Sequence, residues 1–132
     1  MSTPSNRVLS PFQPVVTTSD FDDDEGKAVF VQATGIYEIA SNNSFANGII
    51  ASVDKTGATG RATAYMGHDP VYAKAGGAFD EGAKLTVSSG KLVSTTTAGH
   101  IVVAMALEAS SADGADVKVQ PMFPGVLYSA LA

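Results

Sequence analysis

The sequence predicts an all-β protein, a compact small domain of β-barrel or β-sandwich type built from short strands. Three observations lead to this prediction. Val, Ile and Thr are common, whereas the helix-favouring Leu, Glu, Lys and Arg are sparse. The 13 glycines divide the chain into short apolar segments, as tight turns between strands require. Residues 99–120 alternate in polarity and size with a period of two, which is the period of a β-strand. We therefore expect no helix longer than about two turns.

The stretch 99–120 is the predicted centre of the fold, a β-hairpin. One face of its first strand carries larger apolar side chains, Ile101, Val103, Met105 and Leu107. The opposite face is smaller but also apolar, with Val102, Ala104 and Ala106. A strand that is apolar on both faces belongs in the interior of a sheet or barrel. Asp113-Gly114 supplies the turn, and Val117 and Val119 then alternate with polar residues as in a half-exposed strand.

Length and composition limit what the protein can be. The chain has 132 residues, enough for one domain with its own core, which we place at residues 21–121. The absence of Cys excludes disulfides and thiolate metal sites, and no segment approaches the ~20 apolar residues that span a bilayer. A net charge of −5 with scattered basic residues argues against a nucleic-acid partner. The small share of charged residues is typical of a surface that lies partly against another protein.

Residues 1–20 are expected to form an extended N-terminal arm. Pro4, Pro11 and Pro14 exclude a helix and interrupt any central strand. The arm is nevertheless too apolar for an inert solvated tail, so we expect it to lie along a partner. The residues expected to make this contact are Val8, Leu9, Pro11, Phe12, Pro14, Val15 and Val16. The alternative is that the segment forms an edge strand of the domain itself.

The strands expected after the arm are separated by turn residues. They cover residues 27–33, 36–39, 49–53, 62–66, 71–74, 85–87 and 91–94. Before the first of them, Asp22, Asp23, Asp24 and Glu25 form an acidic run. Carboxylates suit a hard cation such as Ca²⁺, but the spacing of a regular calcium loop is absent. We therefore expect a solvated acidic turn and predict no metal site.

Residues 122–132 are expected to form a C-terminal tail. Pro121, Pro124 and Gly125 break regular structure, and the tail that follows is too apolar to lie in water. It docks on its own domain or on a neighbouring subunit, and we favour the neighbour. The residues assigned to this subunit interface are Met122, Phe123, Val126, Leu127, Tyr128 and Leu131.

No pattern in the sequence favours an enzyme. Gly77 and Gly82 have the spacing of a phosphate-binding loop, but Ala83 stands where the phosphate-binding Lys belongs. His68 and Asp69 are adjacent, so on an extended chain their side chains point to opposite sides and do not form a catalytic pair. No Gly-x-Ser-x-Gly motif is present. We expect no catalytic residue and no cofactor.

From residue 30 to residue 121 the chain resembles the small decoration, or cement, proteins of tailed-phage heads. The resemblance rests on the order of several short motifs rather than on any one of them. These motifs are residues 48–51 before the 57–60 loop, then 69–74, 82–87, 89–93, 102–109, Asp113-Gly114 and 117–119. The N-terminal arm, the acidic run and the C-terminal tail depart from the compact core of that family.

The resemblance implies a compact β fold that assembles as a homotrimer on the outer surface of the expanded capsid. Such a protein staples subunits of the major capsid protein, which is then its partner, and carries no catalysis. The implied location is the outer capsid surface of the virion, and the host cytoplasm during assembly. The resemblance does not extend to the N-terminal arm; from its prolines and apolar residues alone, we expect the arm to become ordered along a groove of the major capsid protein. The alternative function is a virion fibre or surface module that binds host glycans, for which the absence of Trp is unfavourable.

Overall fold

In the computed structural model, which describes residues 10–17, 21, 23–53 and 61–129, the chain forms ten β-strands. No helix occurs among these residues, so the predicted all-β class is confirmed. The first five strands are β1 (Phe12–Val16), β2 (Ala28–Val31), β3 (Tyr37–Ile39), β4 (Gly48–Val53) and β5 (Arg61–Tyr65). The second five are β6 (Val71–Gly76), β7 (Lys84–Ser88), β8 (Lys91–Ser94), β9 (Ile101–Ala106) and β10 (Asp113–Leu127).

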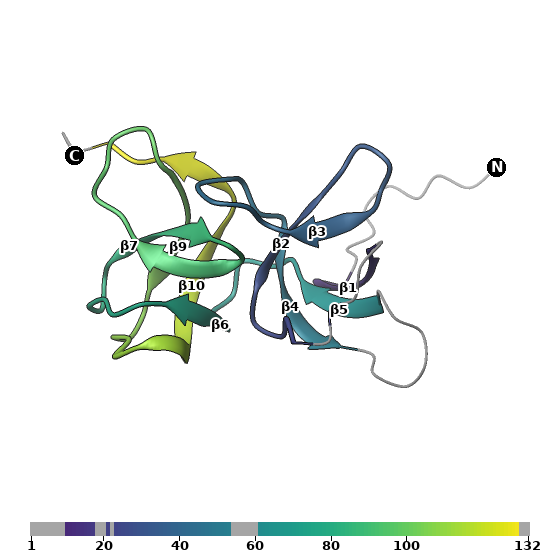
Figure 1. Ribbon diagram of the computed structural model, residues 1–132, viewed down its shortest axis with the longest axis horizontal. Coiled ribbons are helices and arrows are strands. Elements are labelled where there is room, and N and C mark those ends of the chain that lie inside the picture. The colour runs from purple at the N-terminus through teal and green to yellow at the C-terminus, as the bar shows by residue number, and fades with distance from the viewer. Residues whose placement is uncertain (1–9, 18–20, 22, 54–60, 130–132) are drawn as a thin grey trace.

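The two groups of strands form two bodies that lie side by side, an open sheet and a closed barrel (Figure 1). The sheet has the strand order β1-β5-β4-β2-β3, and each pair of adjacent strands is antiparallel. The barrel has the order β10-β6-β8-β7-β9, in which β6 and β8 pair in parallel and the other pairs are antiparallel. The first half of the chain therefore builds the sheet, and the second half builds the barrel.

The residues of the predicted central hairpin lie in β9 and in the first part of β10. β9 pairs with β7 on one side and with β10 on the other, so it is an interior strand. Its burial pattern has no exposed residue, as expected of a strand that is apolar on both faces. β10 is the longest strand, with 15 residues, and it joins β6 through its first part and β9 through its second part. This strand therefore closes the barrel.

The predicted turn at Asp113-Gly114 is wrong in position. Gly114 has the positive φ that a turn glycine adopts, 89°, but Asp113 already pairs with Gly76 of β6. The ladder with β9 runs from Val119, opposite Ala106. The β10 strand pairs with β6 from Asp113 to Val119, and the Leu107 N–H donates to the Lys118 carbonyl (2.9 Å) beside the ladder with β9. A local turn signal cannot reveal the pairing with β6, because β6 is distant in sequence.

Two apolar clusters hold the fold together. The larger one fills the barrel with side chains such as Leu85, Leu92 and Val103, and it continues into the sheet through Ala28 and Ile49. The smaller cluster lies in the sheet and contains buried side chains from β1, β2, β4 and β5, with Phe21 among them. The sheet thus shares one continuous core with the barrel and buries a second set of side chains of its own.

Close backbone contacts join the sheet to the barrel. The Ala28 N–H donates to the Gly90 carbonyl (2.8 Å), and the Lys74 N–H donates to the Gly26 carbonyl (2.9 Å). Gly90 has a φ of 82°, and a Cβ atom there would lie 2.5 Å from Cγ2 of Ile39. Only glycine adopts this left-handed backbone without strain and also leaves room for the Ile39 side chain of β3. The hairpin between β7 and β8 therefore packs directly on the sheet.

The predicted domain limits, residues 21 and 121, need correction at both ends. β1 belongs to the sheet although it precedes residue 21, and β10 continues past residue 121 to Leu127. At the N-terminal end, Pro14 does not prevent pairing, because its missing N–H would point away from β5. At the C-terminal end, the register of β10 shifts between Pro121 and Val126, so the ladder with β9 resumes beyond Pro124.

Candidate interaction surfaces

The predicted capsid-contact residues of the arm fall partly within the sheet. Val8 and Leu9 lie outside the described residues. Residues 12–16 pair with β5 as an edge strand, from Phe12 opposite Tyr65 to Val16 opposite Arg61. This is the alternative that the sequence left open, and it corrects the expectation of a separate arm over these residues. A deletion of residues 2–18 would remove this strand, so it is expected to destabilise the fold.

The side chains of β1 divide between the two faces of the sheet. Val15 is only 2% exposed and packs into the smaller cluster of the sheet, so it is a core residue. Phe12, Pro14 and Val16 share the opposite face and are exposed. The Phe12 ring lies against the Tyr65 ring, with centroids 5.1 Å apart. We call Phe12, Pro14 and Val16 the β1 stripe.

The outer edge of β1 is protected against addition of another strand. The Met66 N–H donates to the Pro11 carbonyl (2.7 Å), so the alternation of an antiparallel pair directs the backbone groups of Phe12 and Pro14 outward. Pro14 has no N–H to offer, and the Phe12 N–H donates to the Ser10 hydroxyl (3.1 Å). Contact with a partner through β1 would therefore use side chains rather than a shared backbone ladder.

The predicted subunit-interface residues lie mainly on the last part of β10. Leu131 is outside the described residues. Met122 and Phe123 are half-buried, and Phe123 packs against the barrel core. Val126 and Leu127 are 48% and 69% exposed, although they pair with Val102 and Ile101 of β9. Tyr128 is half-buried just after the strand. The expected C-terminal tail is thus a strand of its own barrel as far as Leu127, and the strand holds its exposed side chains in place.

One exposed aromatic residue beside this strand was not predicted. Phe45 is 52% exposed, and its Cδ1 lies 3.3 Å from the position of a Cβ atom on Gly125. The next residue fixes this contact, since the Ala46 N–H donates to the Pro124 carbonyl (3.0 Å). Phe45 comes from a loop of the sheet half, and no local pattern in the sequence connects it with β10.

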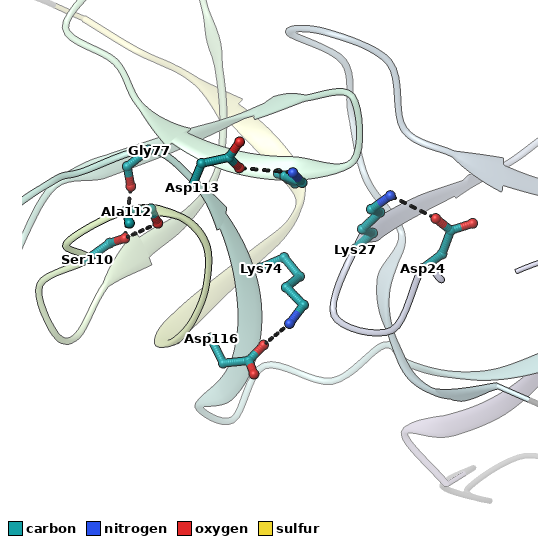
Figure 2. Close-up of polar contacts among 9 residues, drawn as sticks. Asp24, Lys27, Lys74, Gly77, Ser110, Ala112, Asp113 and Asp116 are labelled. Atoms are coloured by element: carbon teal, nitrogen blue, oxygen red, sulfur yellow. Dashed lines mark hydrogen bonds and ion pairs between the residues drawn. The ribbon is translucent and has the colours of Figure 1, made fainter. Parts of the chain in front are cut away.

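The acidic run lines a hollow between the sheet and the barrel. The hollow has a volume of about 830 Å³ and includes Asp23, Glu25, Tyr72 and Asp116 in its lining. Asp24 is not part of this lining; its carboxylate pairs with the Lys27 ammonium at 2.8 Å instead (Figure 2). No group of three His, Asp or Glu side chains among the described residues is placed to hold a metal ion.

Both histidines contact uncharged partners. His68 Nε2 lies 3.3 Å from the Phe123 carbonyl oxygen. His100 Nδ1 lies 2.7 Å from the Thr95 hydroxyl oxygen. The His68 contact therefore joins the loop after β5 to β10, whereas the His100 contact lies within the loop between β8 and β9. The described part of the chain also contains no helix that could span a membrane.

The strand arrangement is shared with a protein of a bacteriophage head. That protein is the head fiber gp8.5 N base of bacteriophage phi29, which matches this chain with a TM-score of 0.65 and 18% sequence identity. The match covers 87% of this chain and 96% of that chain, so the sheet and the barrel are both included. At this identity the likeness shows a common fold. No family model matches the sequence, and no curated protein matches it significantly.

Proposed function

We propose that the protein is a structural component of a bacteriophage head, which binds the outer surface of the capsid as a homotrimer and stabilises contacts between major capsid subunits. The observation that carries the proposal is the fold shared with a phage head fiber base over nearly the whole chain. The order of motifs that resembles the head decoration proteins supports it independently. In this role the protein needs no catalytic group and no cofactor.

The β1 stripe is the proposed capsid-binding surface. Phe12 and Val16 are 50% and 45% exposed. Together they leave on the order of 170 Å² of apolar surface in contact with water, whose burial is worth about 4 kcal/mol before the costs of association. Because β5 already holds the strand, little further backbone entropy is lost when a partner covers the stripe. A rigid apolar stripe at the edge of a sheet is therefore suited to fit a groove of another protein.

Cosedimentation with purified heads tests this proposal. The protein should bind expanded heads and not unexpanded ones, as a clamp across mature subunit contacts would. Replacing both Phe12 and Val16 by Ser should weaken binding by about tenfold to a hundredfold, because most of the apolar contact is lost. Tyr72→Ser is the matched control, since Tyr72 is 57% exposed but lies on the barrel. Equal binding by the double variant and the control would refute the assigned surface.

A fibre base that carries a host-binding module is the second candidate. The name of the similar phi29 protein favours it, because that protein is a head fiber base. Glycan binding by the described domain itself finds less support. Tyr65 is buried and Tyr37 and Tyr128 are half-buried, so Tyr72 is the one tyrosine that is largely exposed, and the sequence has no Trp to stack on a sugar ring. A glycan array tests whether this domain itself binds host glycans, and binding there would favour a host-binding module over a clamp.

A further inference from the structure

The two ends of the barrel differ in their content of charged residues. β10 runs from one end of the barrel to the other (Figure 1). At its start, Asp113 pairs with Lys91 and Asp116 pairs with Lys74, each at 2.9 Å (Figure 2). At its finish, three segments meet that contain no Asp, Glu, Lys or Arg. These segments are residues 39–53, 92–107 and 119–129.

The end without charges exposes apolar side chains that lie next to one another. Leu127 pairs with Ile101 across the β9–β10 ladder. A Cβ atom on Gly125 would lie 2.6 Å from Ile101 Cγ2 and 3.3 Å from Phe45 Cδ1, so Phe45 and Leu127 flank the same spot. Val126 adds an exposed side chain on the other side of the strand. We call Phe45, Ile101, Val126 and Leu127 the uncharged end.

We propose that the uncharged end binds a second copy of this chain. The inference deepens the proposed function, on which it rests for the expectation that copies assemble. Each copy carries a net charge of −5, so two copies repel each other wherever their acidic surfaces meet. The uncharged end is a surface through which two such copies can approach without bringing acids together. Contacts between identical subunits are also the interfaces richest in apolar area.

The exposed area of this surface sets the strength of the contact. Phe45, Val126 and Leu127 expose on the order of 300 Å² together, whereas a stable interface buries about 800 Å² from each partner. The remainder must come from the polar rim, where the loops of residues 40–47 and 94–100 supply Ser, Thr and Asn. We therefore expect association that depends on concentration in solution. On a shared surface that holds the copies close together, effective concentration would strengthen it.

Sedimentation velocity of the purified protein over a wide range of concentrations tests the inference. The wild type should pass from monomer to oligomer as its concentration rises. Leu127→Asp and Phe45→Asp should each weaken association by at least about tenfold, because each places a charge in the contact. Tyr72→Asp introduces the same charge at a residue that is 57% exposed elsewhere on the barrel, and it should associate as the wild type does. Added salt should strengthen association by screening the repulsion between acidic copies.

The outcomes separate this inference from the proposed function. A wild type that stays monomeric at every concentration, or a folded Leu127→Asp variant that associates normally, overturns the inference. If wild-type copies associate as predicted but do not bind heads, the proposed function fails and the inference stands. If instead a monomeric wild type binds heads and Leu127→Asp abolishes that binding, the uncharged end faces the capsid and the inference is overturned. Thermal unfolding of each variant confirms that it is folded.

Discussion

Replacing Gly90 by Ala should disrupt the junction between the sheet and the barrel. Gly90 lies in the turn between β7 and β8, with a φ of 82°, and its carbonyl accepts the Ala28 N–H of β2. A methyl group at this position would lie 2.5 Å from Ile39 Cγ2 and 3.2 Å from two carbon atoms of Lys27. The Ile39 methyl group cannot easily move away, because a β-branched side chain is stiff about χ1.

The expected cost has two separate parts. The left-handed backbone costs an L-residue about 1–2 kcal/mol. The close contact adds about 1–3 kcal/mol, the range typical of an overpacked site. Gly35→Ala isolates the first part, since Gly35 has a φ of 84° and nothing within 4 Å of its Cβ position. We therefore expect Gly35→Ala to lower the free energy of unfolding by about 1–2 kcal/mol and Gly90→Ala to lower it by about 2–5 kcal/mol.

Urea unfolding of four proteins measures the second part directly. The set is the wild type, Gly90→Ala, Ile39→Ala and the double variant. Removing the Ile39 side chain beyond Cβ should relieve the contact, so the double variant should be more stable than the sum of the single effects predicts, by about 1–3 kcal/mol. If Gly90→Ala costs no more than Gly35→Ala and shows no coupling to Ile39, the described packing of the β7–β8 turn against β3 is wrong.

Three further substitutions test other contacts of the fold by thermal or urea unfolding. Val15→Ala should lower the free energy of unfolding by about 1.5–3 kcal/mol, because Val15 is buried. Val16→Ala, at the exposed neighbouring residue, should change it by no more than about 0.5 kcal/mol. Similar effects of the two substitutions would contradict the assignment of β1 to the sheet. Asn43→Ala should lower the free energy of unfolding by about 1–2 kcal/mol, because the Asn43 side-chain oxygen accepts the Ile101 N–H at 2.7 Å and because Ala tolerates the φ of 52° at this position less well. A neutral result would argue against this hydrogen bond. Asp113→Asn should change the free energy of unfolding by less than about 1 kcal/mol, since the ion pair of Asp113 with Lys91 is exposed to solvent. A larger loss would show that water does not screen this ion pair.

The strands that the sequence predicted correctly are those specified by local chemistry. The β7–β8 hairpin is an example. Ser89 and Gly90 both have positive φ, 49° and 82°, and they join the two short strands Lys84–Ser88 and Lys91–Ser94. Gly in a two-residue turn between alternating strands is a signal that lies entirely within a few neighbouring residues. The prediction needed no knowledge of what the hairpin packs against.

The sequence failed where a distant partner decides the structure. Pro14 is predicted to interrupt any central strand and Pro124 to break regular structure, yet β1 and β10 continue through them. Pro14 is tolerated because its missing N–H faces away from β5, and Pro124 lies where the register of β10 against β9 shifts, so both depend on strand pairing. Asn47-Gly48 shows the same limit: the pair matches a local turn signal, yet Gly48 begins β4, and a Cβ atom there would lie 2.7 Å from the Tyr65 carbonyl oxygen of β5. Glycine is required there by a neighbouring strand.

The interaction surfaces could be predicted only in part. Val126 and Leu127 were selected as apolar residues of the C-terminal segment, and both are exposed. Phe45 was missed because it comes from a loop 80 residues away from Gly125, its neighbour in the fold. The distribution of charge contained a usable signal, since three segments without any charged residue are conspicuous in a chain of net charge −5. Only the fold shows that these segments meet.

The proposed function is that this protein binds the outside of a phage head, and cosedimentation with purified phage heads tests this most directly. Wild-type protein is mixed with expanded heads, with unexpanded heads and with no heads, and the pelleted protein is measured as its concentration rises. Saturable binding to expanded heads alone is expected, and its affinity should fall by about tenfold or more when Phe12 and Val16 are both replaced by Ser. Absence of saturable binding to expanded heads by a folded wild-type protein would contradict the proposed function.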